Sequence, residues 1–520
     1  MRRLASSLLL ARLAAAQTVS LAPAPKASNA AGISDVVDSS FAGFGFEPSN
    51  LFSFTGTTSP NGLSVNLLQN LADYAGAPAA MRIGGNTADY MIYDADYSGW
   101  SLKQNPDPQG QGAIPSDSFT YGPNYFKALD RFPKGTEITF GLNLAYEGDD
   151  YLQNIVNEAR AAVSLLKNVR LVSFEVGNEP DLYLKNGFRD APWGGQVYTQ
   201  QFLERASAVY ERVLRPAGLS ATFFEPPATA STIGTTFEIE QLVKDGILAG
   251  VNGSTSLVAG WNQHDYYYFV DVSTYALTLD HMLQLPTTAD QFAYWASQVK
   301  IALSTGLPYY LREMASAGPV GLQGISDTFG AALWTLNFFL YAASLSIAAV
   351  QMHMTDNSFA SAWQPGTMYG KGPHVRPSYA AFAAMAQLLG ACNGSAQIAP
   401  LTLGGVPAGY AGYVGAWAGY ASGALQALVL LNTRASNASA PSGGTLPFSL
   451  ALPGLEGQTL YISRLSAPGA DSTEGVSWNG LSFETSDGTP KKLDKDDSAS
   501  TVKVDSNGNA ATWDARAGGG

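Results

Sequence analysis

Two glutamates, Glu179 and Glu313, stand in similar settings 134 residues apart. Each follows an apolar, strand-like run, Val169–Val176 for the first and Leu307–Leu311 for the second. Gly, Pro and small residues mark where such strands stop. Two carboxyls that meet at one site are what glycoside hydrolysis needs, because one protonates the leaving oxygen and the other attacks the anomeric carbon. The alternatives are a surface turn at Glu179 and a surface salt bridge at Glu313.

The elements that must position these glutamates alternate between residues 40 and 380. Eight segments are strand-like: Phe41–Glu47, Ala79–Ile83, Thr136–Leu144, Val169–Val176, Ala221–Glu225, Leu257–His264, Pro308–Glu313 and Ile347–His353. Helical spacing of apolar residues lies between them, over Asp149–Leu166, Gln200–Leu214, Thr235–Ile247, Asp290–Leu303 and Ser326–Leu345. Ser326 and Asp327 form a start signal for the last of these helices.

Eight such units in one run predict a (β/α)8 TIM barrel over residues 40–380. An open doubly wound sheet is the alternative, and it is disfavoured because no Gly-x-Gly-x-x-Gly turn follows the first strand. Barrel enzymes place their chemistry at the C-terminal ends of the strands, where both glutamates lie. Since side chains alternate along a strand, Arg312 should face the helix layer if Glu313 faces the barrel mouth.

After residue 380 the pattern changes to short strands separated by Gly, Ser, Pro and Asn. The strand-like segments are Tyr410–Trp417, Leu425–Asn432, Thr445–Leu452 and Leu460–Leu465. This pattern predicts an all-β sandwich formed by residues 381–516 together with 17–39, where Thr18–Pro23 is also strand-like. Two domains are expected for a chain of 520 residues.

Charge and the N-terminus bear on partners and location. A net charge of −13 and a pI near 4.8 argue against binding nucleic acid or an anionic membrane surface, and more weakly against a polysulfated substrate. Residues 1–16 have two arginines, a Leu-rich run and an Ala-x-Ala site, which predict a signal peptide. No apolar stretch is long and clean enough to span a bilayer.

Cysteine and asparagine patterns add to the question of location. A single cysteine, Cys392, permits no intramolecular disulfide, which is typical of cytosolic proteins. The signal peptide and the sequons at Asn252, Asn393 and Asn437 favour a secreted, extracellular protein instead. Four scattered histidines and one cysteine give no zinc-ligand spacing, so neither a metal nor a cofactor is expected.

Three motifs carry a resemblance to a known family. Met-Arg-Ile-Gly-Gly-Asn-Thr-Ala-Asp at 81–89, Val-Gly-Asn-Glu-Pro-Asp-Leu-Tyr at 176–183 and Ser-Asp-Thr-Phe at 326–329 resemble glycoside hydrolase family 79. That family includes microbial and fungal β-glucuronidases and the heparanases. The resemblance covers roughly residues 40–385, and the sandwich matches in kind. Asn-Glu-Pro is shared by a wider clan of retaining barrel glycosidases, so the Arg-x-Gly-Gly-Asn stretch is what narrows the resemblance.

The resemblance implies roles for individual residues. Glu179 would be the acid/base and Glu313 the nucleophile, with Tyr266 holding Glu313 as a carboxylate. Asn178 would donate to the sugar 2-hydroxyl, although a turn former is the plainer interpretation. His264 would line the pocket or serve as a satisfied structural histidine.

The remaining implied residues surround the sugar. Glu47, Gly84, Gly85 and Asn86 would lie around its 3- and 4-hydroxyls, with the glycines permitting close backbone approach. For Glu47 the alternative is a helix-start charge. Arg82 would neutralise a carboxylate of the pair or form a buried structural ion pair.

The resemblance implies that backbone amides after the nucleophile and a Tyr after the eighth strand would recognise a uronate carboxylate. In this chain the loop after Glu313 offers the backbone amide of Gly318, but the next residue, Pro319, has no N–H to donate. The first tyrosine after the eighth predicted strand is Tyr369. Together, the glutamate pair, the barrel pattern, the signal peptide and the family resemblance predict a secreted retaining exo-β-glucuronidase. It would act on terminal β-linked glucuronate, with or without 4-O-methylation, in extracellular glycans. The alternatives are an endo-acting heparanase-like enzyme, another retaining β-glycosidase, and a non-catalytic carbohydrate-binding barrel.

Overall fold

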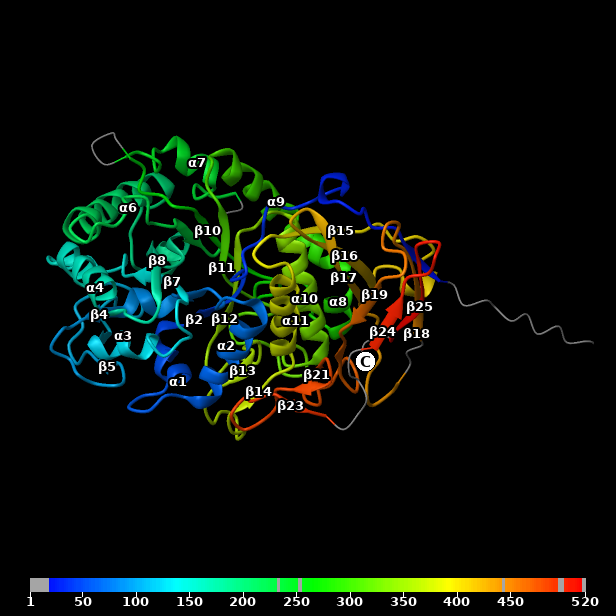
Figure 1. Ribbon diagram of the computed structural model, residues 1–520. Helices are drawn as coiled ribbons and strands as arrows, with labels where there is room; N and C mark the ends of the chain where they lie inside the picture. The colour runs from blue at the N-terminus through cyan, green and yellow to red at the C-terminus, as the bar shows by residue number, and fades with distance from the viewer. Residues whose placement is uncertain (1–17, 232–233, 251–254, 442–444, 494–499, 517–520) are drawn as a thin grey trace, which may run out of the picture.

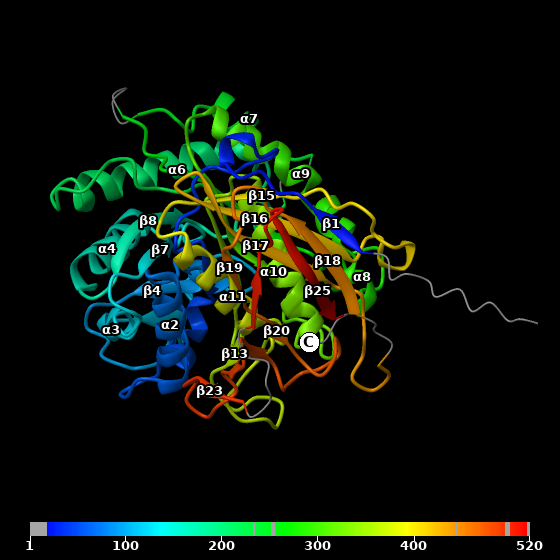
Figure 2. The same ribbon diagram turned by 45° about the vertical axis from the view of Figure 1, so that its right-hand side comes forward.

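The computed structural model describes residues 18–516, apart from 232–233, 251–254, 442–444 and 494–499. The predicted signal peptide and the sequon at Asn252 lie outside the described residues. A barrel and a β-rich part lie side by side in both views of the chain (Figures 1 and 2). Among the helices that are described, none has the length and apolar character that crossing a bilayer requires.

Eight parallel strands form the barrel sheet in the order β8-β7-β3-β2-β12-β11-β10-β9. They are β2 (Ala42–Phe46), β3 (Met81–Ile83), β7 (Glu137–Leu142), β8 (Arg170–Val176), β9 (Pro227–Thr229), β10 (Trp261–Tyr266), β11 (Tyr309–Ala315) and β12 (Ala349–Met354). Bridges from Phe224 to Phe174 and to Val258 bring β8 beside the β9 segment, so the sheet nearly closes. The predicted (β/α)8 barrel with a C-terminal β domain is confirmed.

The fifth barrel strand differs from the predicted strand Ala221–Glu225. Only Phe224 bridges to its neighbours there, and the strand itself is β9, which begins at Pro227. Pro226 and Pro227 lack the N–H groups that continuous hydrogen bonding to the neighbouring strands needs, so the fifth strand is interrupted here.

Of the longer helices in the described part of the chain, seven lie between successive barrel strands and an eighth, α11, follows β12. They are α2 (Gly62–Ala75), α3 (Pro123–Leu129), α4 (Tyr151–Leu165), α6 (Gly195–Val209), α7 (Ile239–Lys244), α9 (Leu285–Ser304), α10 (Phe329–Ser344) and α11 (Ser378–Ala391). The predicted start of the last barrel-connecting helix was two residues early, because Thr328 is the residue whose side chain accepts from the Ala331 N–H. Asp327 instead accepts from the Gly324 N–H in the preceding loop.

The β-rich part covers α10 and α11, as the orange and red strands in Figures 1 and 2 show. Its sheets include β1 (Val19–Leu21), which pairs with β18 (Thr445–Ala451) and through it with β25 (Asn509–Arg516), and the run β15 (Ala396–Pro400), β16 (Val414–Ala421) and β17 (Ala424–Asn432). The Trp478 ring N–H donates to Gln387 on α11 at 2.7 Å. This cover keeps two almost wholly apolar helices away from water, which fixes the barrel side that carries β12 and β2.

Candidate active site

Glu179 sits in a tight turn just beyond β8. Gly177 and Glu179 both have positive φ, +85° and +48°. A non-glycine residue in the left-handed region is uncommon and is often found at functional sites. The Glu179 N–H donates to the Ala228 carbonyl at 2.8 Å, which anchors the turn to β9. The side chain is thereby held at the mouth of the barrel.

Glu313 lies on β11, and the register there corrects one prediction. Gln263 of β10 pairs with Leu311, while the next residue, His264, pairs with Glu313, so Arg312 is skipped. Arg312 does not face the helix layer: it stacks on Tyr310 at 3.9 Å and binds the buried Glu225 with two 2.8 Å contacts. A β-bulge at Arg312 breaks the simple alternation that the prediction assumed.

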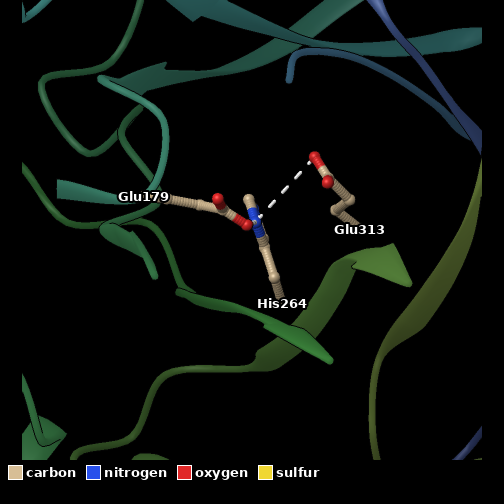
Figure 3. A group of neighbouring side chains, drawn as sticks. All are labelled: Glu179, His264 and Glu313. Atoms are coloured by element: carbon tan, nitrogen blue, oxygen red, sulfur yellow. Dashed lines mark hydrogen bonds and ion pairs between the residues drawn. The ribbon is translucent and has the colours of Figure 1, made fainter. Parts of the chain in front are cut away.

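The two glutamates meet across one small space. One oxygen of each carboxyl and one ring nitrogen of His264 all lie within 4.8 Å of one another. Figure 3 shows Glu179 and Glu313 approaching from opposite sides, with His264 between them. Carboxyls of retaining glycosidases stand about 5–5.5 Å apart, whereas inverting pairs are about 6.5–9.5 Å apart. The observed spacing therefore fits the retaining geometry.

Glu313 is held as a carboxylate. Arg82 Nη1 donates to its Oε2 at 2.5 Å, and the Tyr266 hydroxyl donates to its Oε1 at 2.8 Å. Burial alone would raise the pKa of Glu313, but the neighbouring charges of His353 and Arg82 and the Tyr266 hydrogen bond hold that pKa well below its usual range. An ionised, oriented carboxylate is the state a nucleophile requires.

Glu179 has the opposite environment. Burial and the negative charge of Glu313 raise the pKa of Glu179 to about 8, although Arg82 acts in the other direction. Two carboxyls whose pKa values are driven apart in this way can serve as acid and nucleophile at the same pH.

His264 lies between the two carboxyls and is neutral. Its Nε2 is 3.3 Å from Arg82 Nη2, which can only donate, so Nε2 accepts. The proton is therefore on Nδ1, which donates to Glu179 Oε1 at 3.1 Å. Burial lowers the pKa of His264 to about 4, in agreement with a neutral ring. His264 thus belongs to the pocket, and both of its nitrogens are engaged.

Distances alone would let Glu179, His264 and Glu313 surround a metal ion. The chemistry of the donors does not fit one. The positively charged guanidinium of Arg82 is already hydrogen-bonded to Glu313, and Nδ1 of His264 carries a proton. A cation here would face a guanidinium and a protonated ring nitrogen.

Arg82 ties several site residues together. Its Nε contacts both oxygens of Glu175 at 2.9 and 3.1 Å, and its Nη2 donates to Asn178 Oδ1 at 2.8 Å. Arg82 is fully buried. The two predicted roles coexist, because one guanidinium pairs with the structural Glu175 and with Glu313 of the catalytic pair.

The glycines of the Arg-x-Gly-Gly-Asn stretch serve protein side chains. A Cβ at Gly84 would collide with the Arg82 guanidinium, and one at Gly85 would collide with the Glu47 carboxylate. The glycines permit the close approach of Arg82 and Glu47, and their placement around the sugar stays a prediction. Gly85 has φ +143°, which other residues rarely adopt.

Glu47 and Asn86 lie on the same side of the pocket. Glu47 Oε1 accepts from the Thr87 N–H at 2.9 Å and from the Thr87 hydroxyl, and Oε2 is 3.3 Å from His353 Nε2. Asn86 is exposed, and its Oδ1 accepts from Asn178 Nδ2 at 3.1 Å. These polar groups line the mouth beside Glu179 and Glu313.

Gly318 does not offer the backbone donor expected of it. Its N–H donates to the Tyr268 carbonyl at 2.8 Å, and Pro319 has no N–H. Tyr369 stacks on Phe359 with ring centroids 5.0 Å apart and donates its hydroxyl to the Asn357 carbonyl. The amide and the tyrosine named for uronate recognition are both engaged within the protein.

Sequence reasoning missed two residues that shape the site. His353 is the last residue of the eighth predicted strand, and that position at a strand end was a signal that could have singled it out. Asp89 accepts from the Asn178 N–H at 2.9 Å and from the Tyr183 hydroxyl at 2.6 Å, so it holds the turn before Glu179. Asp89 ends the motif at 81–89, and that position was a signal, although we assigned it no role from the sequence.

Comparisons with known proteins agree with this geometry. Residues 416–514 match the domain described as Glycosyl hydrolase family 79 C-terminal beta domain. Two curated relatives named Beta-glucuronidase are each 27% identical. The one from Neurospora crassa aligns over 88% of this chain and 88% of its own length, and the one from Aspergillus niger over 96% of both.

Solved structures share the fold. A 4-O-α-L-rhamnosyl-β-D-glucuronidase from Fusarium oxysporum 12S superposes with a TM-score of 0.77 at 21% identity, covering 96% of this chain and 98% of its own. A family 51 α-L-arabinofuranosidase from Bifidobacterium longum superposes with a TM-score of 0.59 at 13% identity, with the same coverage. The C-terminal part of the chain thus matches a domain of glycoside hydrolase family 79, and the chain is similar over most of its length to two β-glucuronidases, which supports a glycoside hydrolase.

Proposed function

We propose that the protein is a retaining exo-β-glucuronidase that removes terminal β-linked glucuronate, with or without a 4-O-methyl group, from extracellular glycans. The observation that carries this proposal is the pair Glu179 and Glu313, whose oxygens lie within 4.8 Å and whose pKa values shift in opposite directions. The two relatives named Beta-glucuronidase support the choice of sugar.

The reaction proceeds in two displacements. Glu313 attacks the anomeric carbon while Glu179 gives its proton to the leaving oxygen, so the glycosidic bond breaks and a glycosyl ester forms. Once Glu313 is esterified its negative charge is gone, and the pKa of Glu179 falls. Glu179 then takes a proton from a water molecule, which attacks the same carbon and releases Glu313 and the sugar.

The neighbouring side chains bind and orient the sugar in this scheme. Asn178 Oδ1 accepts from Arg82, so its Nδ2 group is the one that faces the 2-hydroxyl. Tyr266 keeps Glu313 aimed through the 2.8 Å hydrogen bond. Glu47 and Asn86 take the 3- and 4-hydroxyls, since carboxylate and amide oxygens accept hydroxyl protons well.

The substrate is a carbohydrate, and we propose that it is the end of an extracellular glycan chain. The net charge of −13 favours an exo-acting enzyme over a heparanase-like one, because a long polysulfated chain would need a basic groove. Secretion rests on the N-terminal sequence pattern.

A panel of aryl β-glycosides tests the sugar specificity. Wild-type protein should hydrolyse the β-glucuronide with a far higher kcat/KM than the β-glucoside or β-xyloside. Glu313→Ala should abolish turnover while the protein still folds, as a cooperative melting curve would show, and Glu240→Ala, on the exposed side of α7, should leave turnover and Tm unchanged. A glucoside cleaved as well as the glucuronide, or an active Glu313→Ala variant, would refute the proposal.

A further inference from the structure

A glucuronate bound at this site brings a carboxylate that needs a partner. Burying an unpaired carboxylate among protein groups is strongly unfavourable. The expected donors are engaged, because the Gly318 N–H is bonded to Tyr268 and Pro319 has none. The pocket already contains the carboxylates of Glu47 and Glu313, so a further negative charge requires a cation.

Among the described residues, three basic side chains pair with the carboxyls of the pocket: Arg82, His264 and His353. The guanidinium of Arg82 is taken up by Glu175, Glu313 and Asn178. His264 is neutral and uses both ring nitrogens. His353 is the one of the three with a nitrogen still unused.

His353 stands near the end of β12, between Glu47 and Glu313. Its Nε2 lies 3.3 Å from Glu47 Oε2, and its Nδ1 lies 3.7 Å from Glu313 Oε2, too far for a hydrogen bond. Nδ1 is buried and has no hydrogen-bond partner. Burial would lower the pKa of His353, but the charge of Glu313 and the contact with Glu47 outweigh it and raise that pKa. His353 therefore has a buried ring nitrogen beside Glu313 that no protein group satisfies, and a buried polar atom of this kind calls for a partner.

The order of the strands places His353 opposite Asn178. In the eight-stranded sheet β12 is the fourth strand from β8, so the two strands face each other across the barrel. In a pyranose ring, C5 is the atom opposite C2. With the 2-hydroxyl at Asn178, after β8, the carboxylate on C5 points toward β12, where His353 lies. The 4-hydroxyl, next to C5, then faces Glu47, after the adjacent strand β2.

We propose that His353 is the cationic residue that recognises the C5 carboxylate and so selects a uronate over the corresponding neutral sugar. This inference rests on the proposed glucuronidase function. His353 differs from a residue that only orients Glu313, because its charge acts on a group that a glucoside lacks. Its loss must therefore change the choice of substrate as well as the rate.

The test is the His353→Gln variant, assayed with 4-nitrophenyl β-glucuronide and β-glucoside. A charge-assisted contact of this kind corresponds to a factor of about 10 to 100. Since His353 also lies beside Glu313 and Glu47, both substrates will share some loss of rate, but we expect the ratio of kcat/KM for the glucuronide to kcat/KM for the glucoside to fall by about that factor. His374→Gln, in the β14 (His374–Val375) strand, is the matched control and should not change the preference, because its Nδ1 lies against the Gly372 carbonyl at 2.7 Å.

Inhibition by free glucuronic acid and by glucose provides a second reading, which does not need turnover of a poor substrate. The variant should lose affinity for glucuronic acid and not for glucose. Equal losses with both sugars, or an unchanged preference for the glucuronide, would overturn the inference. A melting curve confirms that the variant is folded, and His353→Asn replaces it if it is not.

The wild-type assay distinguishes a failure of the proposed function from a failure of the role assigned to His353. If wild-type protein prefers the glucoside, the proposed function fails and this inference falls with it. If wild-type protein prefers the glucuronide and His353→Gln keeps that preference, only the role of His353 is wrong.

Discussion

Replacing the acid Glu179 with Gln should make the protein more stable at neutral pH. The pKa of Glu179 is raised from 4.5 to about 8 by burial and by the charge of Glu313. The folded state therefore holds a proton that the unfolded state releases, and stability falls as pH rises from about 4.5 to about 8. Glutamine is neutral at every pH and is free of this effect, while its side-chain oxygen can still accept from His264.

The magnitude follows from the two pKa values. At pH 7 the linkage amounts to at most about 3 kcal/mol, and at pH 4.5 to less than about 0.5 kcal/mol. For a chain of this length the unfolding entropy is about 1 kcal/mol per degree, so the Tm of Glu179→Gln should rise by about 3 °C at pH 7. The gain should nearly vanish at pH 4.5.

Thermal unfolding of both proteins at pH 4.5, 6, 7 and 8 measures this effect. Glu240→Gln is the matched control, because Glu240 is exposed in an i,i+4 pair with Lys244 and should give a small shift at each pH. A Glu179→Gln variant with no gain at pH 7, or with the same gain at pH 4.5, would refute the claim that the site holds Glu179 protonated.

Three further predictions follow from the same geometry. The kcat/KM of the wild type should fall as pH rises through about 8, because Glu179 must carry its proton, and a pH–rate profile that is flat to pH 9 would contradict this. Tyr266→Phe removes the 2.8 Å hydrogen bond to Glu313 and should lower kcat by about 10- to 100-fold with little change in Tm; an unchanged kcat would exclude the orienting role. Gly85→Ala places a Cβ against Glu47 and should raise KM for the glucuronide, whereas a wild-type KM would show that Glu47 does not bind the sugar.

The positions of the two glutamates were predictable from the sequence because the topology of a barrel determines where its strand ends lie. Once eight alternating units are recognised, residues at the C-terminal strand ends must converge. The structure brings Asn178, Tyr266 and His264 to the same mouth as Glu179 and Glu313.

What the sequence did not reveal depends on local irregularity and on partners distant in the chain. The bulge at Arg312 has no signature of its own, so strict alternation placed that side chain on the wrong face. The consecutive prolines at 226–227 shortened the fifth strand. The role of the glycines depends on where Arg82 and Glu47 fold back, which only the assembled site determines.

The stereochemistry of hydrolysis tests the central claim most directly. Proton NMR spectra recorded within the first minutes of hydrolysis of an aryl β-glucuronide reveal which anomer of glucuronic acid is released first, before mutarotation mixes the two. Carboxyls as close as Glu179 and Glu313 predict that the β-anomer appears first. Release of the α-anomer first would contradict the double displacement and the nucleophilic role of Glu313.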